Sequence, residues 1–212
     1  MSRPAPKRSP AGAGRTADTG QPPLVGYEVL VCVCGGIAAF KIAALVSELT
    51  QLGCGVSVAM TRHARRFVGP TTFQALTGRP VATSLWSKTG EISHLSLTAA
   101  ADLVVVAPAT ANIIGKLAHG IADDLVSTLL LGVDSPVLLA PAMNVRMWEH
   151  ASVQRNAAWL RDAGILFVGP EKGRLACGTT GRGRMSEPEA LLDAIRKQLL
   201  RRSPKCRPAD DA

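Results

Sequence analysis

Two adjacent glycines, Gly35 and Gly36, follow an apolar run and precede a stretch with the composition of a helix. The turn between a strand and a helix is where doubly wound proteins bind phosphate, because backbone N–H groups and the positive end of the helix point at the ligand. Glycine allows the backbone to approach the phosphate closely. The pair therefore predicts a phosphate site, although an ordinary tight turn between a strand and a helix would use the same residues.

The residues around this turn also indicate which nucleotide is bound. The G-x-G-x-x-G spacing is absent, and the second apolar run ends in Ala59-Met60-Thr61, without the Asp or Glu that would bind the ribose of a dinucleotide. A mononucleotide is therefore favoured over NAD. The Thr61 hydroxyl would lie at the carboxyl end of that strand, where ligands of open α/β sheets bind, or it would cap the turn that follows.

Further groups that could take part in chemistry follow later apolar runs. Thr110 and Asn112 supply hydroxyl and amide groups that could contact a bound nucleotide, with plain N-capping of the next helix as the alternative. Cys177 lies in the polar, Gly-rich stretch Gly169–Gly183. Because buried structural cysteines prefer apolar surroundings, this position favours a functional thiol.

The elements that must position these groups follow from the hydrophobic pattern. Short, almost continuously apolar runs are typical of parallel strands covered on both faces; they are Tyr27–Cys34, Gly55–Met60, Leu103–Ala107, Val137–Ala140 and Ile165–Val168. Helical stretches alternate with them: Ala38–Leu52, Asn112–Leu131 with a break near Ile121–Asp123, Trp148–Ala163, and a last helix from Glu189. The alternation predicts a doubly wound α/β fold, a flavodoxin-like or Rossmann-like parallel sheet with helices on both faces.

The chain has the size of a single domain with tails. Its 212 residues, 47% of them hydrophobic, can bury one full core but are short for two domains. We expect a domain at residues 25–199 between disordered tails at 1–24 and 200–212. The Gly-rich stretch has too few apolar residues to pack as an element, so residues 169–186 are predicted to form a mobile clamp.

The net charge of +8 is concentrated in the tails. Residues 1–24 carry +3 and residues 196–212 carry +4, which leaves +1 for the rest and argues against a nucleic-acid partner. No run reaches the about 18 apolar residues of a membrane span, and no signal peptide is visible. The cysteine spacing fits neither a disulfide framework nor a metal site. We expect a cytoplasmic protein in which Cys32 and Cys34 are small core residues.

Four motifs, in order along the chain, closely resemble those of the homo-oligomeric flavin-containing cysteine decarboxylases. They are Gly35–Lys41, Ala107–Asn112, Pro141–Trp148 and Leu175–Gly178. The Pro-x-Met-Asn-x-x-Met-Trp string of the third motif is highly specific, and the resemblance covers roughly residues 27–195. It is strongest with the decarboxylase half of bacterial bifunctional coenzyme A biosynthesis proteins.

The resemblance implies a flavoprotein sandwich with FMN in a cleft between the subunits of a homotrimer or a dodecamer. The cofactor-binding residues that it implies are Gly35, Gly36, Thr61, Phe67, Thr110, Ala111 and Asn112. It implies substrate contacts for Ala142, Met143 and Met147. The catalytic residues would be His94, Asn144 and Cys177.

The implied reaction is the FMN-dependent decarboxylation of 4′-phosphopantothenoylcysteine to 4′-phosphopantetheine in coenzyme A biosynthesis. Loss of carbon dioxide needs an electron sink, which oxidation of the CH₂–SH group to a thioaldehyde would supply, so that an enethiolate results. His94 would manage the substrate proton, Asn144 would donate to the carboxylate, and Cys177 would protonate the enethiolate carbon. Without the resemblance, a histidine among apolar residues such as His94 would be assigned to the core.

Two alternatives stay open. A peptidyl-cysteine decarboxylase of the lantibiotic type would stop at the enethiol, and the Leu175–Gly178 motif speaks against it. A non-catalytic flavin-binding regulatory subunit is disfavoured because His94, Asn144 and Cys177 occur in one chain. Since the resemblance covers the decarboxylase half alone, we also expect a separate phosphopantothenate–cysteine ligase, and neither a nucleic acid nor a membrane as a partner.

Overall fold

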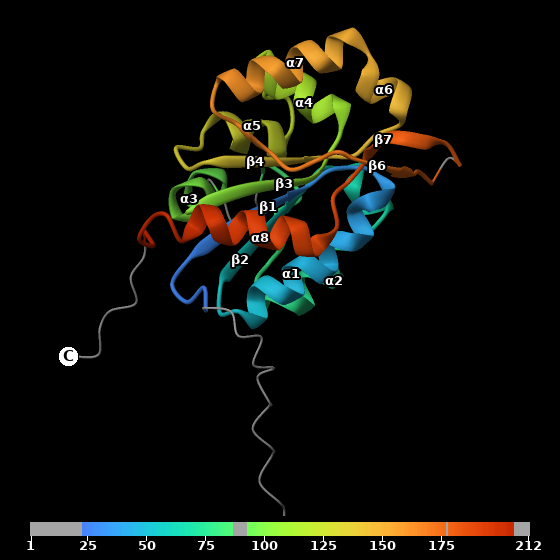
Figure 1. Ribbon diagram of the computed structural model, residues 1–212. Coiled ribbons are helices and arrows are strands. Elements are labelled where there is room, and N and C mark those ends of the chain that lie inside the picture. Colours follow the sequence, from blue (N-terminus) through green and yellow to red (C-terminus); the bar gives the residue numbers. More distant parts are fainter. Residues whose placement is uncertain (1–22, 87–92, 177, 206–212) are drawn as a thin grey trace, which may run out of the picture.

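The computed structural model describes residues 23–86, 93–176 and 178–205, with the backbone alone at residues 93–95. It contains a five-stranded parallel sheet in the order β2-β1-β3-β4-β5 (Figure 1). The strands are β1 (Glu28–Val33), β2 (Gly55–Met60), β3 (Leu103–Ala109), β4 (Val137–Pro141) and β5 (Leu166–Phe167). All the strands predicted from the apolar runs are present. The sequence left a flavodoxin-like and a Rossmann-like strand order open, and the observed order is the flavodoxin-like one.

Helices cover both faces of the sheet, which makes three layers (Figure 1). Side chains alternate along a strand, so Val29, Val31 and Val33 of β1 pack in one layer while Leu30 and Cys32 pack in the other. The first layer holds α1 (Ile42–Gln51), α2 (Pro70–Thr77) and α8 (Pro188–Leu199). The second holds α3 (Ser93–Ala100), α4 (Ala111–Ala118), α5 (Leu125–Leu131) and α7 (Ala151–Asp162). Among the described residues, no helix has both the length and the apolar character that crossing a membrane requires.

Cys32 and Cys34 are core residues, as predicted. Neither side chain is more than 2% exposed. Burial, together with the charge of Asp124, raises the pKa of the Cys32 thiol to about 12. The thiol therefore stays protonated at neutral pH, and a protonated thiol is a poor nucleophile.

The helix boundaries differ from the predicted ones at two places. A 3-10 turn, η1 (Ile37–Lys41), precedes α1 in the stretch expected to be one helix. The expected break before α5 is present, and Asp124 caps that helix by accepting from Ser127 N at 2.9 Å. The stretch expected as one helix from Trp148 is two helices, α6 (Val145–Glu149) and α7, divided at His150. The sequence analysis assigned no element to η2 (Ala64–Arg66), α2 or α3.

The prediction that the Gly-rich stretch packs as no element is wrong. It forms an antiparallel hairpin of β6 (Glu171–Arg174) and β7 (Thr180–Arg184). Backbone pairing needs no apolar side chains, and glycine lets β7 lie against the segment that follows β4. At Gly183, with φ +154°, a Cβ would come 2.3 Å from the carbonyl oxygen of Met143. Met143 N also donates to Gly183 O at 3.0 Å, so the hairpin is fixed to that segment.

Described residues next to the predicted domain limits contact the folded unit. Leu24 is fully buried. Tyr27 Oη donates to Arg202 O at 2.7 Å, and Lys205 N donates to Asp102 Oδ1 at 2.7 Å. The chain at residues 24, 202 and 205 is thus in contact with the domain, whose limits at residues 25 and 199 stay predictions.

Candidate functional site

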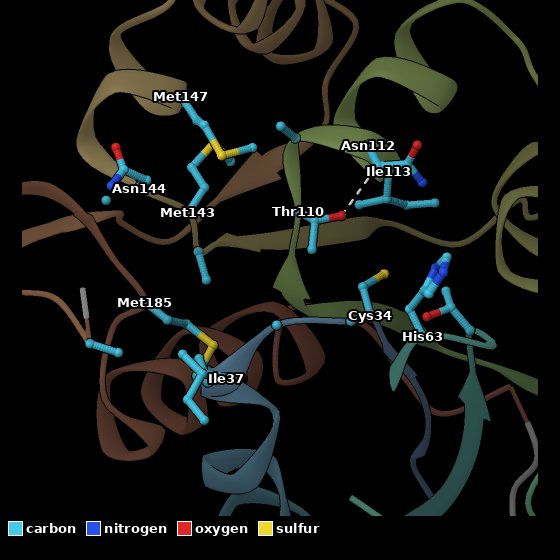
Figure 2. Close-up of a pocket in the computed structure, with 18 of the residues that line it drawn as sticks. Cys34, Ile37, His63, Thr110, Asn112, Ile113, Met143, Asn144, Met147 and Met185 are labelled. Carbon is cyan, nitrogen blue, oxygen red and sulfur yellow. Dashed lines mark hydrogen bonds between the residues drawn. The ribbon is translucent and has the colours of Figure 1, made fainter. Parts of the chain in front are cut away.

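A cavity of about 980 Å³ lies where the strand order reverses, between β1 and β3. Its walls come from the segments that follow β1, β2, β3 and β4 and from the β6–β7 hairpin (Figure 2). Open α/β sheets bind ligands at this switch point, outside the carboxyl ends of the strands. The volume lies at the upper end of the range of small-molecule sites, which is enough for a nucleotide together with a second small ligand.

Most of the predicted site residues line this cavity. They are Gly35, Gly36, Thr61, Thr110, Ala111, Asn112, Ala142, Met143, Asn144 and Met147. Phe67 is not among the lining residues, and its side chain is 46% exposed just after η2. His94 lies in α3, where the structure gives its backbone alone, and Cys177 lies outside the described residues.

The turn after β1 is narrow because another segment lies directly against it. A Cβ at Gly35 would come 2.5 Å from the Cβ of His63, which is closer than two carbons can pack. At Gly36 a Cβ would meet Pro108 Cγ at 3.6 Å, an ordinary contact. The packing of the turn against the segment after β2 therefore requires glycine at position 35. At position 36 the packing would leave room for a Cβ.

Two threonine hydroxyls at the cavity cap the helical turns that follow them, which was the alternative to ligand binding. Thr110 Oγ1 accepts from Ile113 N at 3.4 Å and caps α4. Thr61 Oγ1 accepts from Ala64 N at 3.2 Å. A hydroxyl that accepts one hydrogen bond still has its own proton to donate, so capping leaves both able to contact a bound anion. The first N–H groups of α4 have no partner within the helix and add to the attraction for negative charge.

Asn144 is positioned by α6. It is the N-cap residue of that helix, and its Oδ1 accepts from Arg146 N at 2.8 Å. This bond sets the orientation of the amide at the cavity wall, beside Met143 and Met147 (Figure 2). Trp148 of the same helix is buried and packs in the second layer of the core.

Sequence reasoning missed most of the charged and several apolar residues of the wall. These are Ile37, Phe40, Lys41, Arg62, His63, Lys116, Asp123, Asp124, Arg174, Arg184 and Met185. Among them, His63 lines the cavity, and its side chain makes no capping hydrogen bond to η2 (Figure 2). The available signal was position: Lys41 ends the first family motif and Arg174 directly precedes the fourth.

Lys116 and two carboxylates form an ion-paired group in the wall. Lys116 Nζ lies 2.5 Å from Asp123 Oδ1 and 2.7 Å from Asp124 Oδ2. Burial lowers the pKa of Lys116, but the hydrogen bonds to both carboxylates outweigh it, so the net shift is upward. The group therefore stays fully ionised at neutral pH and carries a net charge of −1.

Comparison with known proteins agrees with this architecture. The flavoprotein family model matches residues 20–200. The coenzyme A biosynthesis bifunctional protein of Bacillus subtilis (strain 168) is 50% identical over 176 residues, which cover 82% of this chain and 43% of the relative. That of Escherichia coli (strain K12) is 44% identical over 172 residues, which cover 80% and 42%. The chain spans less than half the length of these relatives.

Solved structures with the same fold include two decarboxylases. The FMN-dependent cysteine decarboxylase SpaF superposes with a TM-score of 0.72 at 33% identity, covering 84% of this chain and 98% of that one. A PPC decarboxylase variant complexed with pantothenoylaminoethenethiol superposes with a TM-score of 0.72 at 31% identity, covering 81% and 97%.

Proposed function

We propose a reaction that follows from the family: the chain belongs to the flavoprotein family and, within it, to the flavin-containing cysteine decarboxylases. The proposed reaction converts 4′-phosphopantothenoylcysteine to 4′-phosphopantetheine in coenzyme A biosynthesis. One observation carries the proposal: a single cavity joins the Gly35–Gly36 turn to Asn144 of the Pro141–Trp148 motif. The relatives named for coenzyme A biosynthesis are 50% and 44% identical, which favours this substrate over a peptide.

The flavin that we propose is FMN. The cavity fits it because the turn at Gly35 packs too closely for a side chain, and the α4 N-terminus and the Thr61 and Thr110 hydroxyls face the same space. No carboxylate follows directly after β2, where a dinucleotide would find a partner for its ribose. When bound, FMN supplies a two-electron acceptor that also returns the electrons, so no nicotinamide is needed.

The protein residues bind, orient and move protons. The Asn144 amide, oriented by its bond to Arg146 N, donates to the substrate carboxylate without adding charge, so the departing group is not held too tightly. His94 takes the substrate proton, since an imidazole titrates near neutrality. Met143 and Met147 form apolar walls that exclude water. Cys177 gives a proton to the enethiolate carbon in the return step, which closes a redox-neutral cycle.

We propose further that the protein forms a homotrimer, or a dodecamer made of four trimers, with sites shared between subunits. Support comes from large apolar side chains near the cavity that the single chain leaves about half exposed, which are Ile37, Phe40, Phe67 and Met147. A phosphopantothenate–cysteine ligase activity would supply the substrate. A cytoplasmic location fits the free thiols of the described cysteines, Cys32, Cys34 and Cys54.

The function is tested by mixing the purified protein with 4′-phosphopantothenoylcysteine and following 4′-phosphopantetheine and carbon dioxide by mass spectrometry. The protein should be yellow and should release FMN, without FAD, on denaturation. A parallel reaction with a peptide that ends in cysteine tests the lantibiotic-type alternative. Turnover of the peptide alone would replace the proposed substrate, and a colourless protein that takes up no added FMN would contradict the whole proposal.

A further inference from the structure

Three charged side chains from separate segments meet beside the cavity. Lys41 ends η1, Arg184 ends β7 and Glu187 is the N-cap residue of α8. Lys41 Nζ donates to the two carboxylate oxygens of Glu187 at 2.8 and 2.7 Å, and Arg184 donates to one of the same oxygens. We name this group the Lys41–Glu187–Arg184 cluster.

The cluster presents net positive charge to the cavity. Lys41 and Arg184 line the cavity, and Glu187 is not among the lining residues. The hydrogen bonds from Lys41 and then from Arg184 hold the pKa of the Glu187 carboxyl below its ordinary value, so the carboxylate is ionised at neutral pH. One carboxylate balances one of the two cations, which leaves a net charge of +1.

Both cations are held in place before a ligand arrives. The Lys41 side chain is 19% exposed and is fixed by its two hydrogen bonds to the carboxylate. The Arg184 side chain lies across Gly173 of the facing strand, where a Cβ would come 3.0 Å from Arg184 Cδ. Side chains that are already ordered lose less conformational freedom on binding. Arginine and lysine are the side chains that proteins use for phosphate, because they donate charge-assisted hydrogen bonds.

The cluster is separate from the region that fits the flavin phosphate. Met185, which follows Arg184, and Ile37, which begins the turn that Lys41 ends, lie on one side of the cavity, and His63 and Cys34 lie on the other (Figure 2). The wall that includes Lys116 also holds Asp123 and Asp124 and has a net charge of −1. A second phosphate group would be repelled by these carboxylates and attracted by the cluster.

We propose that Lys41 and Arg184, positioned by Glu187, bind the phosphate monoester of the substrate. This rests on the proposed function and deepens it, because it names what distinguishes the phosphorylated substrate from a cysteine peptide. A phosphate monoester carries a charge between about −1 and −2 at neutral pH and has three acceptor oxygens, enough for both cations. Glu187 acts through the two cations and is a positioning residue.

The test compares 4′-phosphopantothenoylcysteine with its unphosphorylated counterpart, pantothenoylcysteine, on the FMN-loaded protein. Losing one charge-assisted hydrogen bond in Arg184→Gln or Lys41→Met should lower the ratio of kcat/KM for the two substrates by about 10- to 100-fold. Arg182→Gln is the matched control, since Arg182 lies on the same strand, donates to Pro170 O and is not a lining residue. The control should keep the parental ratio.

Two outcomes would overturn the proposed phosphate site. An equal fall of kcat/KM for both substrates in both variants would make the cluster purely structural and overturn the proposal. A larger dissociation constant for FMN, with an unchanged ratio of kcat/KM for the two substrates, would assign the cluster to the flavin phosphate. That result would also overturn the proposal. If the parental protein decarboxylates neither substrate, the proposed function fails. The subsite is then tested alone by calorimetry, in which 4′-phosphopantetheine should bind more tightly than pantetheine and Arg184→Gln should abolish the difference.

Discussion

At the scale of single residues, the cavity is shaped by two positions where the backbone leaves no room for a side chain. One is Gly35, pressed against His63, and the other is Gly183, pressed against the Met143 carbonyl. Around them the polar groups are fixed by local hydrogen bonds, as when Asn144 and Thr110 cap the helices that begin at the cavity. A catalytic or binding group whose orientation is set in this way loses less freedom when a ligand arrives.

Replacing Gly35 with alanine should destabilise the protein by about 1–3 kcal/mol, because the new Cβ would force the turn and the His63 segment apart. Gly36→Ala should cost less than about 1 kcal/mol, since its Cβ meets only an ordinary contact and glycine is itself entropically unfavourable. Urea unfolding of both variants measures the difference. Equal stabilities would show that the turn relaxes at no cost.

Replacing Cys177 with serine should separate the reaction into two halves. Oxidation and loss of carbon dioxide should continue, but a hydroxyl is a far weaker proton donor than a thiol, so the return step should stall. The variant should release carbon dioxide once per flavin under anaerobic conditions, bleach the visible flavin band and form the enethiol. Stopped-flow absorbance and mass spectrometry follow these products. Cys206→Ser, in the predicted tail, is the control, and a Cys177→Ser enzyme that makes the saturated thiol at the parental rate would remove the proposed role.

At the scale of elements, the β6–β7 hairpin is attached to the site through its second strand. Gly183→Ala should separate β7 from the Met143 carbonyl and break the bond from Met143 N, with a loss of about 1–3 kcal/mol of stability and a higher KM for substrate. Gly173→Ala on the facing strand is the matched control. There the new Cβ meets only the flexible side chain of Arg184, so stability should change little. Thermal unfolding of both variants compares their stabilities, and steady-state kinetics of Gly183→Ala measures the change in KM.

The start of α5 should give a pH-dependent contribution to stability. Burial raises the pKa of Asp124, but the hydrogen bonds from Lys116 and Ser127 outweigh it, so its folded-state pKa lies below the ordinary value of 3.8. A carboxyl with a lowered folded-state pKa stabilises the protein fully above its unfolded pKa, and the contribution is lost as the pH falls through the folded value. Asp124→Ala should therefore cost about 1–2 kcal/mol at pH 7 and progressively less below about pH 3.8.

Denaturant unfolding across this pH range measures the contribution of Asp124, with Asp123→Ala as the control. Asp123 pairs with the same lysine but caps no helix, so its replacement should have the smaller effect at pH 7. A pH-independent cost of Asp124→Ala would mean that the charge of the carboxylate is not what stabilises the helix.

At the scale of the whole molecule, the proposed oligomer would cover apolar side chains near the cavity that the single chain leaves exposed. Ile37 and Phe40 are each 58% exposed on η1, and Met147 is 49% exposed on α6. Burying such side chains removes apolar surface from water and favours association. Multi-angle light scattering of the FMN-loaded protein should give a trimer or a multiple of it. Phe40→Asp should shift the population towards monomer and weaken FMN binding together, and a strict monomer with full activity would contradict shared sites.

The sequence by itself determined the layered α/β fold, because short, near-continuous apolar runs that alternate with helical stretches are typical of parallel strands covered on both faces. It also located Thr61, Thr110 and Asn112, since residues at strand ends must meet at one edge of a parallel sheet, whereas Asn144 was indicated by the family resemblance of the Pro141–Trp148 motif. The tertiary structure decided what depends on distant segments. No local sequence pattern indicates the strand order β2-β1-β3-β4-β5 or the hairpin made by backbone pairing. The same holds for the contact of His63 with Gly35 and for the convergence of Lys41, Arg184 and Glu187. Hydrophobic periodicity reports burial within one element, whereas these features come from contacts between elements far apart in the chain.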